Sequence, residues 1–134
     1  MRKLYLLLLA AILTACTTIT KQEQDTLHIL QANGITVDKP IGNFERPANP
    51  AGAAALNLLP GGGDFYLASG NAGDSSYWLY GFLNLLTWPF SIIWGVPEAA
   101  IDAGTINKRE LVYYYQFNPM GKKELAKANI SLTN

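Results

Sequence analysis

Residues 77–96, "YWLYGFLNLLTWPFSIIWGV", decide the fold of this chain. The stretch has 20 positions and no charged side chain. As a helix it would reach about 30 Å, the thickness of a hydrocarbon core. It is rich in the aromatic residues that gather at membrane interfaces, with tyrosines at 77 and 80 and tryptophans at 78, 88 and 94. We expect membrane contact, and a buried core helix is the alternative.

A second apolar arm precedes this stretch, at residues 51–68, with Asp64 as its only charge. The segment between the arms, "SGNAGDSS", has the composition of a turn. Pro60 and the following glycines interrupt the first arm, and Pro89 interrupts the second. We therefore predict a kinked helical hairpin whose arms touch at the glycines. This hairpin would span a bilayer, enter one leaflet or pack as a core.

The two arms resemble a known family. "LNLLPGGGDFYLAS" and "YGFLNLLTWPFSIIWGVPEAAIDA" are similar to the domain with two transmembrane segments found across bacteria and in animal amyloid-peptide-binding proteins. The matching residues are Gly61, Gly63, Phe65, Tyr66, Leu67, Leu85, Leu86, Thr87, Trp94 and Asp102. The family usually has histidine where this chain has Asp64, and Pro89 and Pro97 are additional here. The resemblance implies a membrane-embedded hairpin without catalysis.

The N-terminus has the parts of a secretory signal peptide. Arg2 and Lys3 are followed by an apolar run, residues 4–13, that is too short to span a bilayer. The small residues Thr14 and Ala15 come next, immediately before the single cysteine, Cys16. Residues 1–15 are thus predicted to be removed.

The stretch "LTAC", formed by Leu13, Thr14, Ala15 and Cys16, resembles the lipobox of bacterial lipoproteins. The resemblance implies that the Cys16 thiol receives diacylglycerol and that its freed amine is acylated, for example with palmitate, which together give a stable anchor. Lipoproteins with aspartate directly after the cysteine tend to stay at the inner membrane, so with Thr17 at this position the resemblance implies the periplasmic leaflet of the outer membrane, with the inner membrane as the alternative. A structural cysteine or an uncleaved anchor helix are the other interpretations.

Residues 16–50 are predicted to be a lipid-anchored polar spacer or a disordered tether. Thr20 or Asp25 could cap a short helix that stops at Asn33 and Gly34. A helix from Pro97 is expected to end at Gly104, and the C-terminal part follows at residues 105–134. The tyrosine-rich residues 111–117 look strand-like or extended, and Asn118 caps a last amphipathic helix, about residues 119–129.

The sequence offers few groups for chemistry. His28 is the lone histidine and is expected to be solvated. Asp64, Glu98 and Asp102 are candidate partnered acids, and Glu98 and Asp102 are expected to pair with Lys108 or Arg109 or to face water. We predict no catalytic residues, no metal site and no cofactor. Without Arg2 and Lys3, eight basic and ten acidic side chains remain, a net charge of −2, which argues against nucleic acid as a partner.

The sequence therefore predicts a mainly α fold with four parts: a signal peptide (1–15), a spacer (16–50), an apolar hairpin (51–104) and a tyrosine-rich segment with a C-terminal helix (105–134). The expected function is that of a non-enzymatic envelope lipoprotein. It would hold membrane lipid through the Cys16 acyl chains and associate with itself or an envelope protein through the hairpin. The alternative is a phage- or prophage-type exclusion lipoprotein that acts on an envelope receptor or channel.

Overall fold

The computed structural model describes residues 18–70 and 74–132, and the regular structure within them is helical. In chain order the helices are α2 (Lys21–Ala32), α3 (Pro50–Leu56), α4 (Gly62–Ser69), α5 (Ser76–Thr87), α6 (Ile92–Phe117) and α7 (Pro119–Lys127). The predicted mainly α fold class is confirmed. Cys16 and its predicted cleavage flank, Leu13 to Ala15, lie outside the described residues.

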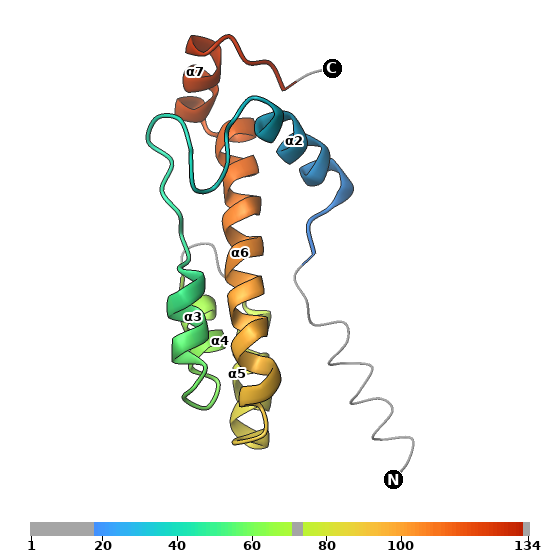
Figure 1. The fold of residues 1–134 in the computed structure, drawn as a ribbon, viewed down its shortest axis with the longest axis vertical. Helices are drawn as coiled ribbons and strands as arrows, with labels where there is room; N and C mark the ends of the chain where they lie inside the picture. The colour runs from blue at the N-terminus through green and yellow to red at the C-terminus, as the bar shows by residue number, and fades with distance from the viewer. Residues whose placement is uncertain (1–17, 71–73, 133–134) are drawn as a thin grey trace.

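The long helix α6 runs through the whole molecule (Figure 1). Helices α2, α3, α4 and α7 pack against it, and α5 packs against α4. We call the part formed by α3, α4, α5 and the beginning of α6 the lower half, and the part formed by α2, α7 and the end of α6 the upper half. The upper core consists of Leu27, Leu30, Ile35, Phe44, Leu111, Val112, Tyr115 and Leu125. The lower core consists of Ala48, Ala53, Leu67, Tyr77, Ala99, Ala103 and Ile106.

Helix α2 begins after Thr20, one of the two predicted caps, and ends where the sequence predicts. The Thr20 hydroxyl accepts the Glu23 backbone N–H, and the Glu23 carboxylate accepts the Thr20 backbone N–H in return, which is a complete capping box. The helix ends at Asn33. Its Leu27 and Leu30 are buried in the upper core, and Ile19 packs against the same core, so from this point on the polar segment lies on the folded domain.

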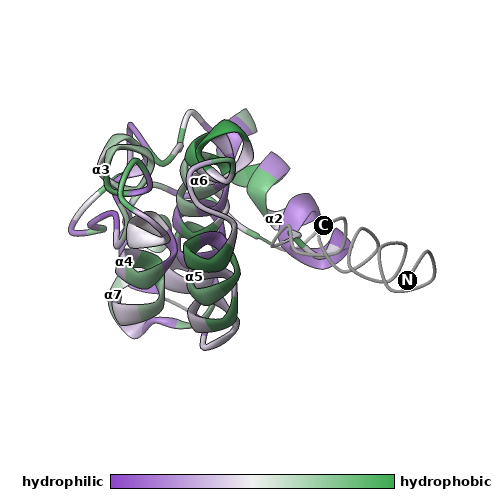
Figure 2. Cartoon of the chain, turned by 90° about the horizontal axis from the view of Figure 1, so that it is seen from below, coloured by the Kyte–Doolittle hydropathy of each residue, from purple (hydrophilic) through white to green (hydrophobic). Residues whose placement is uncertain are grey.

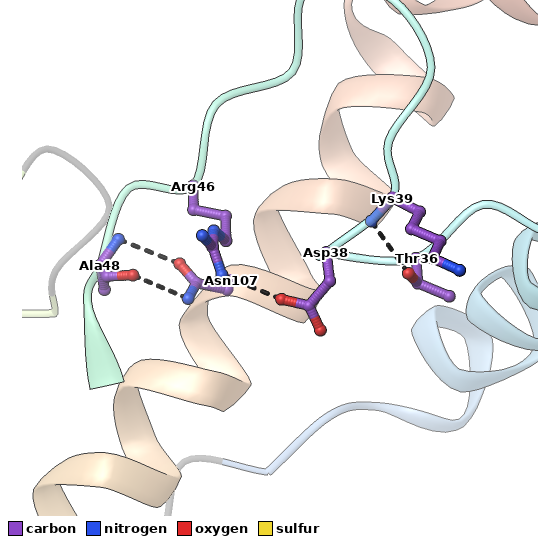
Figure 3. Close-up of polar contacts among 6 residues, drawn as sticks. All are labelled: Thr36, Asp38, Lys39, Arg46, Ala48 and Asn107. Carbon is purple, nitrogen blue, oxygen red and sulfur yellow. Dashed lines mark hydrogen bonds and ion pairs between the residues drawn. The ribbon is translucent and has the colours of Figure 1, made fainter. Parts of the chain in front are cut away.

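The connection from α2 to α3, residues 33–49, has little regular structure and is held to α6 by side chains. The Tyr115 hydroxyl donates to the Ile41 carbonyl oxygen at 2.6 Å and accepts the Ile41 N–H at 2.9 Å. Eight residues earlier on α6, Asn107 makes the same kind of two-way contact with the backbone of Ala48 (Figure 3). These contacts give the irregular backbone fixed partners on the long helix.

Each predicted apolar arm is divided into two helices, at the positions where proline and glycine predicted a break. The first arm turns at Pro60 and Gly61, and the second turns after Trp88, whose peptide bond to Pro89 is cis. Gly61 has a φ of 69°, and a Cβ there would collide with the backbone of Gly81 on α5. In the part of the chain that the structure describes, no helix is both long and apolar enough to cross a membrane. The hairpin of two long apolar arms is therefore not present as predicted.

Two local predictions on α6 are wrong. Residues 111–117 are helical, not strand-like, because Leu111, Val112 and Tyr115 fall on one helix face that fills the upper core. This packing outweighs the β preference of the individual residues. Gly104 does not end a helix, and Pro97 does not begin one, since both lie inside α6. The predicted last helix is confirmed as α7, with Asn118 as its N-cap.

Candidate functional site

The lower half has an inverted distribution of side chains. Its buried polar residues include Asn57, Asp64, Asn84, Ser91 and Asp102. Its strongly exposed apolar residues include Leu58, Leu59, Phe82, Leu85, Leu86, Trp88, Phe90 and Ile93, which we call the apolar tip. Leu86 is 80% exposed and Ile93 is 78% exposed. In Figure 2, which views the molecule from below, hydrophobic colour covers much of α5, whereas α2 is largely hydrophilic.

Helix α5 shows the inversion most clearly. Its buried positions are Tyr77, Gly81 and Asn84. Its exposed positions include Phe82, Leu85 and Leu86, which recur at the spacing of one helix face. An amphipathic helix of a water-soluble protein turns its apolar face to the core and its polar face to water. Here an asparagine and a glycine face inward, and leucine and phenylalanine face outward.

Asn84 is the centre of the buried polar contacts. Its Nδ2 donates to the Asp64 carboxylate at 2.5 Å, which joins α5 to α4. Its Oδ1 accepts the indole N–H of Trp94 at 3.1 Å, and its backbone carbonyl accepts the Ser91 hydroxyl at 2.9 Å. Together these bonds link α5 to α4 and to the beginning of α6.

Asn57, which follows α3 directly, is a second buried asparagine of the lower half. Its Oδ1 accepts the Gly63 N–H at 2.9 Å and thereby supports the first turn of α4. Gly95 of α6 lies against both asparagines, because a Cβ added there would be 2.6 Å from Asn57 Nδ2 and 3.2 Å from Asn84 Nδ2. Gly95 thus lets α6 approach both amides.

The three candidate acids converge behind the apolar tip. Asp64 and Asp102 are each 1% exposed, and Glu98 is half-buried one helical turn before Asp102. Burial raises the pKa of Asp64, and the hydrogen bond from Asn84 opposes that shift. Burial also raises the pKa of Glu98 to about 7, with further contributions from the charges of Asp64 and Asp102.

The expected pairing of these acids with Lys108 or Arg109 stays a prediction. The Arg109 guanidinium forms an ion pair with Glu23 of α2 at 3.3 Å, and Lys108 is exposed. Asp102 does not face water, because it is buried. The chain has no lysine, arginine or histidine between Arg46 and Lys108, so the whole lower half lacks a cationic side chain of its own.

The buried asparagines are the site residues that the sequence analysis missed. A signal for them exists, because the tetrapeptide "LNLL" occurs twice, at residues 56–59 and 83–86, each time shortly before a proline. In both copies the asparagine is buried and the last two leucines are exposed. The repeat marks two polar positions that face inward at the ends of two apolar helices.

Chemistry-bearing groups are otherwise sparse. His28 is exposed on α2. Within residues 18–70 and 74–132, no group of three or more histidine, cysteine, aspartate or glutamate side chains is placed to hold a metal ion. No protein-family model, curated protein or solved structure matches the chain. The resemblances to bacterial lipoproteins and to the two-transmembrane-segment domain stay predictions.

Proposed function

We propose that this protein is a non-enzymatic, lipid-anchored component of the bacterial envelope whose apolar tip lies in one leaflet of a membrane. The inverted lower half carries the proposal. In water, a surface formed by Leu86, Phe90, Ile93 and their neighbours is unfavourable, and apolar patches of this kind mark sites of membrane or protein contact. In lipid the same surface is favourable, and buried polar groups are partnered inside the protein, as Asp64 and Asn84 are here.

The dimensions of the lower half favour one leaflet. Helix α5 has 12 residues and is about 18 Å long. One leaflet contributes about 15 Å of hydrocarbon. The two turns at the lower end, around Leu59 and Phe90, would lie deepest, and both carry exposed apolar side chains. In this arrangement the predicted hairpin acts as two short helical pairs that enter a leaflet from one side.

The predicted lipid anchor lies close to the folded domain. Cys16 precedes Thr18 by two residues, a distance of at most about 7 Å. In Figure 1 the blue segment before α2 runs downward from that helix, toward the end that carries the apolar tip. An acylated Cys16 would therefore hold the domain at the surface of the membrane that its own tip enters.

The test separates the tip from the anchor. Residues 17–134 can be exported behind an ordinary cleavable signal peptide, without acyl chains, and they contain every residue that the structure places in the two cores. We expect this form to float with phosphatidylcholine vesicles.

The variant Phe90→Ser with Ile93→Ser should lose at least tenfold in partition into the vesicles, because each exposed side chain contributes roughly 1.5 kcal/mol or more on transfer from water to lipid. The matched control, Phe117→Ser with Met120→Ser, changes two exposed residues of the upper half and should bind normally. If residues 17–134 with the wild-type sequence do not float with the vesicles, the proposal is contradicted.

A further inference from the structure

If the apolar tip enters a leaflet, Glu98 enters the hydrocarbon with it, because Glu98 lies near the lower end of α6. It follows Ile92, the first residue of α6, by six residues, which is about 9 Å along the helix axis. A leaflet offers about 15 Å of hydrocarbon. Asp64 and Asp102 are enclosed by the protein, but Glu98 is only half-buried, so its carboxyl group is the one that changes surroundings when the tip enters lipid.

The groups around Glu98 do not neutralise a negative charge. Helix α4 presents Asp64, and α6 itself presents Asp102, both acidic. Helices α3 and α5 have no charged residue. The titratable groups of α5 are the phenols of Tyr77 and Tyr80. The nearest basic residues in the sequence are Arg46, which pairs with Asp38, and the exposed Lys108.

We propose that the insertion of the apolar tip is coupled to protonation, and that the Glu98 carboxylate takes up one proton from water as the tip enters the leaflet. This inference rests on the proposed membrane function and adds its regulation. An ionised carboxylate is costly in hydrocarbon, whereas the neutral acid is far less so. Two neighbouring acids oppose ionisation further, since like charges favour the protonated form. Binding to lipid should therefore be tighter at low pH.

The size of the effect follows from the pKa of about 7 that the free protein gives Glu98. At pH 5.5 nearly every molecule carries the proton, whereas at pH 8 about one in ten does. If only the protonated form inserts, partition into vesicles is about tenfold stronger at pH 5.5 than at pH 8. Phosphatidylcholine vesicles suit the experiment because their zwitterionic headgroups have no net charge and do not titrate in this range.

The experiment measures flotation of residues 17–134 with such vesicles at both pH values. Wild type should show the tenfold difference. Glu98→Gln should bind at pH 8 as strongly as wild type binds at pH 5.5 and should lose the pH dependence. Glu45→Gln removes an exposed acid of the 33–49 connection and should keep the wild-type profile. Circular dichroism confirms that each variant is helical.

A second measurement does not depend on any variant. In weakly buffered solution at pH 8, adding vesicles to wild type should take up close to one proton for each molecule that inserts. Strong binding that is equal at both pH values, without proton uptake, would overturn the coupling and leave the membrane function intact. Absence of binding at both pH values would overturn the membrane function itself.

Discussion

Asn107 and Ala48 form a closed pair of hydrogen bonds across the molecule. The Ala48 N–H donates to Asn107 Oδ1 at 2.9 Å, and Asn107 Nδ2 donates to the Ala48 carbonyl oxygen at 2.8 Å (Figure 3). Both residues are buried, and 59 positions separate them in the sequence. This pair fixes the end of the irregular connection just before α3 begins.

Replacing Asn107 with alanine should therefore destabilise the fold strongly. It would leave a buried N–H and a buried carbonyl of Ala48 without partners, at a cost of roughly 2 to 4 kcal/mol in the free energy of unfolding. Urea unfolding followed by circular dichroism measures this. Arg46→Ala is the control, because its ion pair with Asp38 is exposed and is worth less than about 1 kcal/mol. Equal losses for the two variants would contradict the assignment.

Two glycine substitutions should have opposite effects. Gly61→Ala places a side chain at positive φ and against the backbone of Gly81, and should lower the free energy of unfolding by about 2 kcal/mol. Gly104→Ala lies inside α6, where no atom beyond the adjacent residues and the surrounding helix backbone lies within 4 Å of the new methyl group. It should raise stability by about 0.5 to 1 kcal/mol through helix propensity. Thermal unfolding of both variants tests the close approach of the α3–α4 turn to α5.

The folding stability of the protein should fall as the pH rises between about 4.5 and 7. The pKa of Glu98 is about 7 in the folded chain, against an ordinary value of 4.5, so the folded state binds more protons than the unfolded state in this window. Stability then decreases with increasing pH, and the raised pKa of Asp64 acts in the same direction. Urea midpoints at pH 5 and pH 8 measure the slope. Glu98→Gln should flatten it, and an unchanged slope in that variant would assign it to other groups.

Cys16 should be the only site of acylation. Metabolic labelling with palmitate should mark the wild-type protein and should be lost completely in Cys16→Ser, because the chain has no second cysteine. The variant should also accumulate as a precursor whose processing no longer responds to globomycin. A mature protein of unmodified mass in wild-type cells would refute the anchor.

The helix caps and breaks could be predicted from the sequence, because neighbouring residues determine them. Thr20 and Asn118 cap helices because their side chains accept nearby backbone N–H groups, and this needs no tertiary contact. The breaks near Pro60 and Pro89 are likewise local, since proline lacks a donor and restricts the residue before it.

Sequence reasoning failed where distant contacts decide. The tyrosine-rich residues 111–117 are helical because α2 and α7 cover them, and neither contact is visible in a window of sequence. Gly104 and Pro97 are tolerated inside α6 because the helix is packed along its length. The inward orientation of Asn57 and Asn84 depends on how α3, α4, α5 and the beginning of α6 meet, although their shared "LNLL" context marks them.

The short distance from Cys16 to the first core residue has a further consequence. Ile19 already packs on the upper core, so an acylated Cys16 would be joined to that core by a segment of at most about 10 Å. Such a short connection would keep the apolar tip next to the lipid directly beneath it. The effective concentration of the tip at that membrane would be high even if its intrinsic affinity for lipid is modest. If Cys16 is acylated as we propose, a ligand on the far side of the periplasm would stay out of reach, and a partner would have to meet this protein at the membrane.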